Sequence, residues 1–263
     1  MSVFDIFKKN EGTPQNQFSS NAVLNQSASK LHSSNTPTLA DRIRNARPSE
    51  AGLYPHEILM LSYANTFTTG QNNFQKFWLY DYSVDSPQQL LNSLFSRGFI
   101  CPSSVNYSLS KLPVADLKSL LTKVNEKASG KKSDLIERIL TAYSQQQLEK
   151  MFPIRYFQLS PKGETEVSQN EYVLYLHRHH YMTVWDMNYT LKATNTDAKH
   201  YRDIIWREFN RQSIDHMKNG DFGLYRNTRL DMHDFVLEEK KYRSALQLLC
   251  EVISYDLSGH GNG

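Results

Sequence analysis

The chain of 263 residues has little cysteine and no long apolar run. Its two cysteines, Cys101 and Cys250, lie far apart with no partner at metal-ligand spacing, which is typical of small core residues in a reducing compartment. No stretch reaches the roughly 18 apolar residues that a transmembrane helix needs. The N-terminus lacks the apolar run and the cleavage site of a secretory signal. We therefore expect a cytoplasmic protein with no membrane-spanning segment.

The sequence also lacks the phosphate loop, the dinucleotide-binding fingerprint and the nucleophile elbow of common enzyme classes. These absences favour a non-enzymatic binding protein with no catalytic residues and no cofactor. One cluster, His177-Arg178-His179-His180, could bind Zn²⁺ or another metal together with Asp186 or Asp203. Because no HxxxE, paired-carboxylate or CxxC pattern accompanies the cluster, we predict no metal site. A metal-dependent nuclease is the least favoured alternative.

Polar residues are concentrated at the N-terminus. Residues 11–50 are dominated by Asn, Gln, Ser and Thr, so residues 1–50 are predicted to form a disordered tail. Val3, Phe4, Ile6 and Phe7 make a small apolar cluster beside Lys8 and Lys9, which could touch a partner or an anionic membrane surface. A disordered terminus is the favoured interpretation of this segment. Overall, 39% of the residues are hydrophobic, which is enough to bury a sizeable core.

Ordered sequence is expected from about residue 51. The run Asp85-Ser86-Pro87 is typical of a helix cap followed by proline in the first turn. The helix that follows, residues 88–97, is predicted to end at Gly98. Its apolar face is made by Leu90, Leu91, Leu94 and Phe95.

Residues 111–143 predict two short helices joined by a bend that contains glycine. The first apolar face consists of Val114, Leu117, Leu120, Leu121 and Val124, and the second of Leu135, Ile136, Ile139 and Leu140. The chain's formal charge of +3 is too small to indicate a nucleic-acid partner. This segment, however, has seven basic and four acidic residues. At Gly130-Lys131-Lys132, two ammonium groups lie beside the N–H groups that open the second helix, a combination suited to a phosphate.

This segment resembles the SAP family. The resemblance is carried by Leu112, Val114, Asp116-Leu117-Lys118, Leu121, Gly130-Lys131-Lys132, Asp134-Leu135-Ile136 and Arg138-Ile139. It implies double-stranded DNA binding, with some members meeting RNA or serving in protein assemblies. The predicted nucleic-acid-binding residues are Lys111, Lys118, Gly130, Lys131, Lys132 and Arg138. The chain departs from the family at residues 125–128, where an apolar residue often precedes the glycine, and this predicts a looser bend.

Segments on both sides of the SAP-like module suggest a second fold. The run Tyr156-Phe157-Gln158-Leu159-Ser160-Pro161-Lys162-Gly163-Glu164 looks like the wing of winged-helix regulators, which normally follows a helix like residues 88–97. We therefore predict a winged-helix-like domain, residues 51–107 and a wing-like hairpin at 146–170, interrupted by the SAP-like module at 108–145. Its recognition helix would offer Gln88, Gln89, Asn92 and Arg97, a set with little basic character.

Residues 171–263 predict a C-terminal helical bundle. Their apolar residues at helical intervals include Ile204, Ile205, Phe209, Ile214, Met217, Phe235, Val236, Leu237, Ala245, Leu246, Leu248, Leu249, Val252 and Ile253. The predicted fold is thus mainly α with a small β wing.

The function predicted from these patterns is that of an adaptor that binds double-stranded DNA, with RNA as the alternative nucleic acid. Its C-terminal helices are predicted to bind a protein partner or a second copy. A protein-interaction scaffold without DNA binding is the alternative. The Asn- and Ser-rich tail together with the embedded module suggests a bacterial or phage protein.

Overall fold

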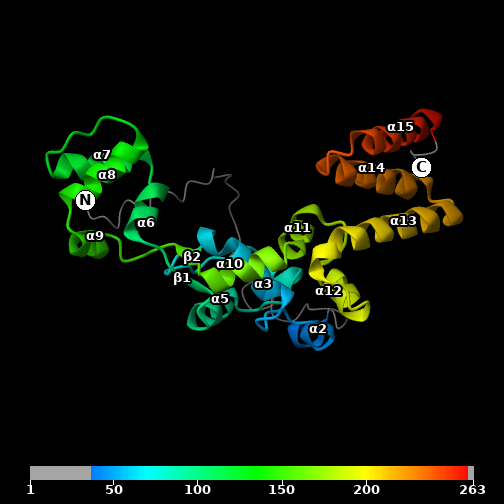
Figure 1. Ribbon diagram of the computed structural model, residues 1–263, viewed down its shortest axis with the longest axis horizontal. Helices are drawn as coiled ribbons and strands as arrows, with labels where there is room; N and C mark the ends of the chain where they lie inside the picture. The colour runs from blue at the N-terminus through cyan, green and yellow to red at the C-terminus, as the bar shows by residue number, and fades with distance from the viewer. Residues whose placement is uncertain (1–36, 260–263) are drawn as a thin grey trace, which may run out of the picture. The chain divides into compact units, whose positions relative to one another are not determined.

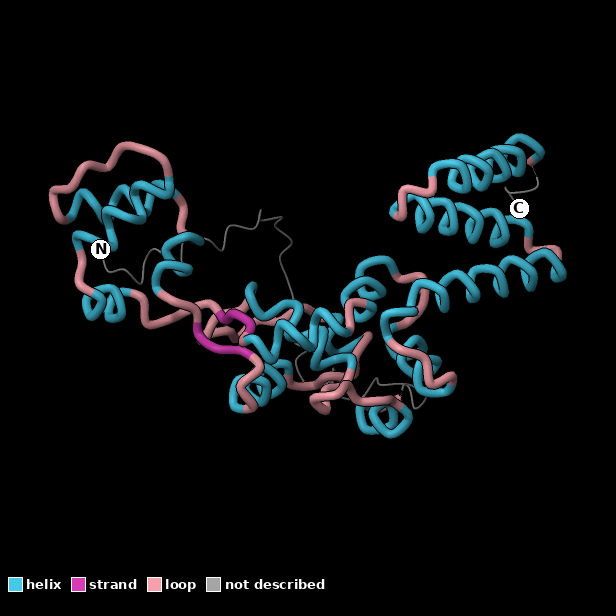
Figure 2. Tube along the Cα trace, viewed as in Figure 1, coloured by secondary structure: helices cyan, strands magenta, loops and turns pink. Residues whose placement is uncertain are grey.

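The computed structural model describes residues 37–259, and the chain is mainly helical with one small sheet, as predicted (Figures 1 and 2). It divides into two compact units. The first contains residues 60–164 and also 37–41, and the second contains residues 42–59 and 165–259. The boundaries fall within helices α2 (Leu39–Asn45), α3 (Pro55–Tyr63) and α10 (Pro161–Gln169). Within residues 37–259, no helix combines the length and the apolar composition needed to cross a bilayer.

The other elements of the first unit follow one another in chain order. They are η1 (Ala64–Thr66), α4 (Phe77–Tyr80), α5 (Pro87–Ser96), β1 (Ile100–Pro102), α6 (Val105–Lys111), α7 (Val114–Lys123), α8 (Lys132–Ala142), α9 (Gln145–Met151) and β2 (Phe157–Leu159).

Helix α5 forms where its cap and apolar spacing predict it. The Ser86 hydroxyl accepts a hydrogen bond from the Gln89 N–H at 3.4 Å, Pro87 occupies the first turn, and Gly98 follows with φ +75°. Leu91 and Leu94 are buried, but Phe95, predicted on the same face, is 46% exposed. The amphipathic pattern therefore predicted the helix and its buried residues Leu91 and Leu94, but it also placed the exposed Phe95 on the buried face.

The sheet of the first unit joins segments that are distant in the sequence. Strands β1 and β2 pair antiparallel, with Ile100 opposite Leu159 and Pro102 opposite Phe157. The helices α6 to α9 lie between the two strands in the chain, so they are an insertion in this part of the fold. The predicted hairpin within residues 146–170 is wrong. β2 finds its partner before the insertion, and the chain after it forms a helix, α10, because Ser160 caps the N–H of Gly163 at 3.2 Å.

The predicted disordered tail is also wrong for its last part, while residues 1–36 lie outside the described residues. Helix α2 forms there, and its C-terminal carbonyl groups have partners in the second unit. Lys192 Nζ donates to the carbonyl oxygens of Asn45, at 2.9 Å, and Ala46, at 3.2 Å. These long-range contacts order a segment whose composition alone favours disorder.

The second unit ends in three consecutive helices. Its further elements are α11 (Tyr172–His179), α12 (Val184–Ala193), η2 (Ala198–His200), α13 (Tyr201–Asn219), α14 (Phe222–Glu238) and α15 (Tyr242–Ser258). Gly220, at φ +76°, ends α13 where the sequence predicts it. Phe235 of α14 packs against Phe209 of α13 with ring centroids 5.6 Å apart. The orange and red helices α14 and α15 form a hairpin (Figure 1).

Candidate nucleic-acid interface

Helices α6 to α9 share one apolar core. Leu117, Leu120 and Leu121 of α7 meet Leu135 and Ile139 of α8, and each of the five is at most 1% exposed. Burial of such a side chain contributes about 1.5–3 kcal/mol to stability. The core is completed by Val105, Leu109, Leu112, Leu148 and Phe152 from the flanking helices. The core of the predicted helix pair therefore also includes side chains from α6 and α9, two helices that the apolar pattern of the pair does not predict.

Two side chains predicted on the buried faces lie outside this core. Val114 is 40% exposed and Leu140 is 37% exposed. Val114 is the first residue of α7, and Leu140 follows the fully buried Ile139, so it points away from the helix partner. The C-terminal end of α8 is held instead by Tyr143, whose hydroxyl donates to the Leu120 carbonyl at 2.9 Å. Burial raises the pKa of this Tyr143 hydroxyl.

The bend between α7 and α8 is held by Arg138. Its guanidinium donates to the carbonyl oxygen of Ser129 at 2.7 Å and to that of Lys127. Gly130 has φ +127°, and a Cβ there would lie 2.8 Å from Arg138 Nη2. Glycine is therefore required both for the backbone conformation and for the space that Arg138 fills.

Residues 125–128 do not leave this bend loose. Asn125 adopts φ +57° after the end of α7, and the Glu126 N–H donates to the Leu121 carbonyl at 3.0 Å. Ala128 is partly buried against the core of α6 to α9. The small apolar Ala128 and the Arg138 hydrogen bonds thus fix the segment in which the sequence differs from the SAP pattern.

The start of α8 presents two exposed lysines. Lys131 is the residue before the helix and Lys132 is its first residue. The Lys131 N–H is bound by Asp134 Oδ2 at 3.2 Å, while the first N–H groups inside the helix have no intrahelical acceptor. The corner therefore combines two ammonium groups with the partially positive end of a helix, which attracts an anion.

Of the six predicted contact residues, five are exposed and Arg138 is half-buried. Gly130, Lys131 and Lys132 are contiguous at this corner, and the exposed Lys118 belongs to α7. Lys111 ends α6 and lies 5.0 Å from the ring centroid of Tyr107, which positions its ammonium group. Arg138 is different, because its hydrogen bonds are used on the carbonyl groups of the bend. We assign it to holding the bend.

Sequence reasoning left two exposed cations of the same module out of the predicted set. Lys123 is the last residue of α7, and Lys127 lies in the bend. Both contribute to the positive charge of the segment, but the prediction was based on the Gly130-Lys131-Lys132 corner, and both lie outside it. Among the described residues, neither takes part in an ion pair. Both ammonium groups are therefore available to a phosphate backbone.

The histidine cluster has a structural environment. His179 stacks on Tyr175, with ring centroids 4.3 Å apart, and its Nδ1 lies 3.4 Å from Glu238 Oε1. Asp186 accepts a hydrogen bond from Thr183 at 2.6 Å at the start of α12, and Asp203 lies beside His200. Across the described residues, no group of three or more His, Cys, Asp or Glu side chains is arranged to hold a metal ion. Within residues 37–259, the structure therefore does not bring the predicted metal ligands together.

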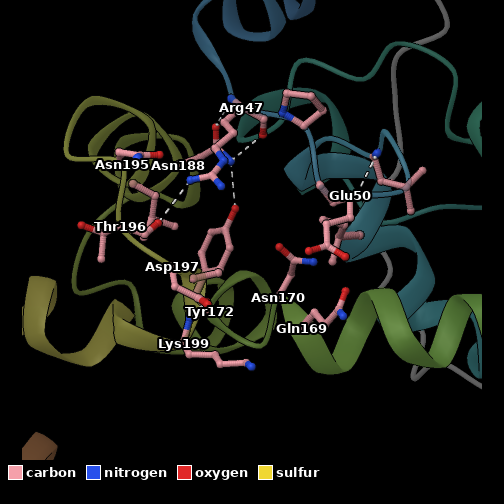
Figure 3. A pocket seen from close by; sticks show the side chains of 16 residues that line it. Arg47, Glu50, Gln169, Asn170, Tyr172, Asn188, Asn195, Thr196, Asp197 and Lys199 are labelled. Atoms are coloured by element: carbon pink, nitrogen blue, oxygen red, sulfur yellow. Dashed lines mark hydrogen bonds between the residues drawn. The ribbon is translucent and has the colours of Figure 1, made fainter.

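A polar cavity of about 300 Å³ lies within the second unit (Figure 3). Asn188 at its wall exchanges two hydrogen bonds with the Arg47 main chain, at 2.8 and 3.0 Å, and donates to the Tyr172 hydroxyl at 3.0 Å. The Arg47 guanidinium donates to the Thr196 carbonyl at 3.3 Å. Burial raises the pKa of Tyr172 to about 12, so this hydroxyl stays protonated at neutral pH. These groups bind one another and join Arg47 to α12 and to the segment that follows it.

Comparison with known families identifies the module. Residues 108–144 match the family model of the SAP domain. The match includes α7, the bend and α8, and it confirms the predicted module. Comparison with curated proteins gave no match, and comparison with solved structures gave none either. The chain thus contains a SAP domain, a nucleic-acid-binding module without catalytic groups of its own.

Proposed function

We propose that the protein is a non-enzymatic adaptor that binds double-stranded DNA through the SAP domain, while its C-terminal helices associate with a protein. The observation that carries this proposal is the coincidence of the SAP match with the exposed Lys131–Lys132 corner at the start of α8. Lys131, Lys132 and Lys118 contact phosphate groups, and Lys111, Lys123 and Lys127 add attraction along the module.

Two features support phosphate contacts over base contacts. The exposed cations of the module are lysines, which act as point charges, whereas bidentate recognition of a base edge is typical of arginine. The arginine of the helix pair, Arg138, is committed to the bend. We therefore expect tolerant binding of duplexes, in which phosphate contacts dominate the affinity and its salt dependence.

The test is fluorescence anisotropy of a labelled duplex, measured with the full chain over a series of salt concentrations. We expect Lys131→Ala/Lys132→Ala to weaken binding by about 10- to 100-fold at low salt. The slope of log affinity against log salt should fall by about two, because two phosphate contacts are lost. The matched control is Lys199→Ala/Lys218→Ala, which removes two exposed charges from the second unit and should bind like the wild type.

Other outcomes have definite meanings. A wild-type protein that binds single-stranded RNA with higher affinity than the duplex would reassign the nucleic acid. A wild-type protein that binds no nucleic acid even at low salt would contradict the proposal and favour the protein-interaction scaffold.

A further inference from the structure

The polar cavity of the second unit contains a buried hydrogen-bond donor that the protein does not use (Figure 3). Tyr172 of α11 lines the cavity and is 1% exposed, and its hydroxyl oxygen accepts a hydrogen bond from Asn188 Nδ2 at 3.0 Å. Within the described residues, the proton of this hydroxyl has no acceptor. A buried donor without an acceptor destabilises a fold, so such groups usually have a partner.

The Arg47 guanidinium is a second donor group at the same end of the cavity. Its Nη1 donates to the Thr196 carbonyl at 3.3 Å, whereas Nε and Nη2 have no acceptor in the part of the chain that the structure describes. Burial has the largest effect on the Tyr172 hydroxyl and raises its pKa to about 12, while the nearby Arg47 charge lowers that pKa. The free donors of Arg47 and Tyr172 are therefore neighbours.

Asn188 fixes the position of both donors. Its Oδ1 accepts the Arg47 main-chain N–H at 2.8 Å, and its Nδ2 donates both to the Arg47 carbonyl and to the Tyr172 hydroxyl at 3.0 Å. Because the side-chain amide acts as a donor toward Tyr172, the hydroxyl proton cannot point at Asn188. The hydroxyl is therefore held in place as a donor for a group outside this network.

The charges around the cavity select the group that these donors fit. Two basic residues line it, Arg47 and Lys199, and two acidic ones, Glu50 and Asp197, so the formal charge of the lining is zero. A phosphate monoester carries about 1.5 to 2 negative charges at pH 7 and would be repelled by the two carboxylates. A carboxylate carries a single charge, and its planar pair of oxygens matches the geometry of a guanidinium.

We propose that this cavity binds a small organic acid through one carboxylate group, whose oxygens accept hydrogen bonds from the Tyr172 hydroxyl and the Arg47 guanidinium. The volume of about 300 Å³ is at the lower end of the range for ligand pockets, which fits a small molecule and excludes a polymer. The site lies in the second unit, so it is independent of DNA binding by the SAP domain of the first.

The test is a titration of the full chain with acetate, the simplest carboxylate probe, followed by two-dimensional NMR of the Asn188 side-chain amide and the Arg47 Nε–H. We expect shifts that saturate with a dissociation constant on the order of 1–10 mM, because the probe has few atoms. Acetamide has the same shape without the charge and should bind at least about 10-fold more weakly. Chloride at the same ionic strength should cause no saturable shift.

Two variants remove the donors separately. Arg47→Gln should weaken acetate binding at least about 10-fold, because it removes the guanidinium and keeps the main-chain bonds to Asn188. Tyr172→Phe, which removes only the hydroxyl, should weaken binding about 5- to 10-fold. Arg47 is exposed, so its variant tests the site even if Tyr172→Phe fails to fold. Arg178→Gln is the matched control, since it removes an exposed guanidinium of α11 outside the cavity and should bind like the wild type.

Several results would overturn the proposal. Shifts with acetate that do not saturate, or that equal those with chloride, would mean that water alone occupies the cavity. Acetate binding that is unchanged in Arg47→Gln, or weakened equally in Arg178→Gln, would place the probe elsewhere on the protein. Saturable binding of inorganic phosphate without a response to acetate would show a phosphate site and contradict the carboxylate assignment.

Discussion

Gly163 is the residue at which helix α10 meets the main chain just before β1. A Cβ at this position would overlap the carbonyl oxygen of Phe99. The contact is stabilised by Ser160, whose hydroxyl lies 2.7 Å from the Gly98 carbonyl oxygen and accepts the Gly163 N–H. The Ser-Pro-Lys-Gly run thus allows the start of α10 to pack closely against the main chain between α5 and β1.

We expect Gly163→Ala to lower the free energy of unfolding by about 2–3 kcal/mol, because the added methyl group must displace main-chain atoms that cannot rotate away. Urea denaturation followed by circular dichroism measures the change. Ser168→Ala, at an exposed position of the same helix, is the control and should stay within about 0.5 kcal/mol of the wild type. An equal effect of both substitutions would show that Gly163 is not a packing position.

At the scale of elements, α8 combines a structural side and a binding corner. Leu135 is fully buried in the α6–α9 core and lies one turn from the Lys131–Lys132 corner. The corner keeps its geometry only while this buried side holds α8 against α7. A substitution that loosens the packing of α8 against α7 should therefore also weaken DNA binding at the Lys131–Lys132 corner.

Leu135→Ala should destabilise the α6–α9 helices by about 2–4 kcal/mol, because it removes a fully buried side chain and leaves a cavity. Hydrogen exchange of the α7 and α8 amides should accelerate, and duplex binding should weaken as the open population grows. Leu140→Ala, on the exposed side of the same helix, should change neither quantity noticeably. Undisturbed amide protection in Leu135→Ala would contradict this description of the core.

Local signals predicted the elements whose ends they mark. Ser86 and Pro87 mark the start of α5, and Gly220 marks the end of α13. The leucine spacing of α7 and α8 predicts the core that these two helices share. The SAP corner followed from a continuous pattern of the same kind. Each of these features depends on residues close together in the sequence, so a single sequence contains the information.

Features that depend on distant partners could not be predicted. The β1–β2 pairing joins residues 100 and 159, and α2 is ordered by Lys192. The role of Arg138 depends on carbonyl groups that lie eleven and nine residues earlier in the sequence, which no residue pattern marks. In α15, apolar spacing alone cannot tell whether Leu246 or Leu248 faces α14, because both fit a helical stripe. The exposed side became visible only when the hairpin partner was known.

At the scale of the whole molecule, the SAP domain belongs to the first unit, whereas helices α11 to α15 belong to the second. The proposed function assigns DNA binding to the first unit and protein association to the second. The two activities should therefore respond to separate substitutions.

We expect Leu246→Glu/Ile253→Glu, at two exposed positions of α15, to bind a short duplex like the wild type, because both positions lie outside the unit that contains the SAP domain. Anisotropy titrations with the full chain measure this affinity, and Lys131→Ala/Lys132→Ala is the variant that should weaken it. Equal weakening in both variants would contradict the assignment of DNA binding to the first unit.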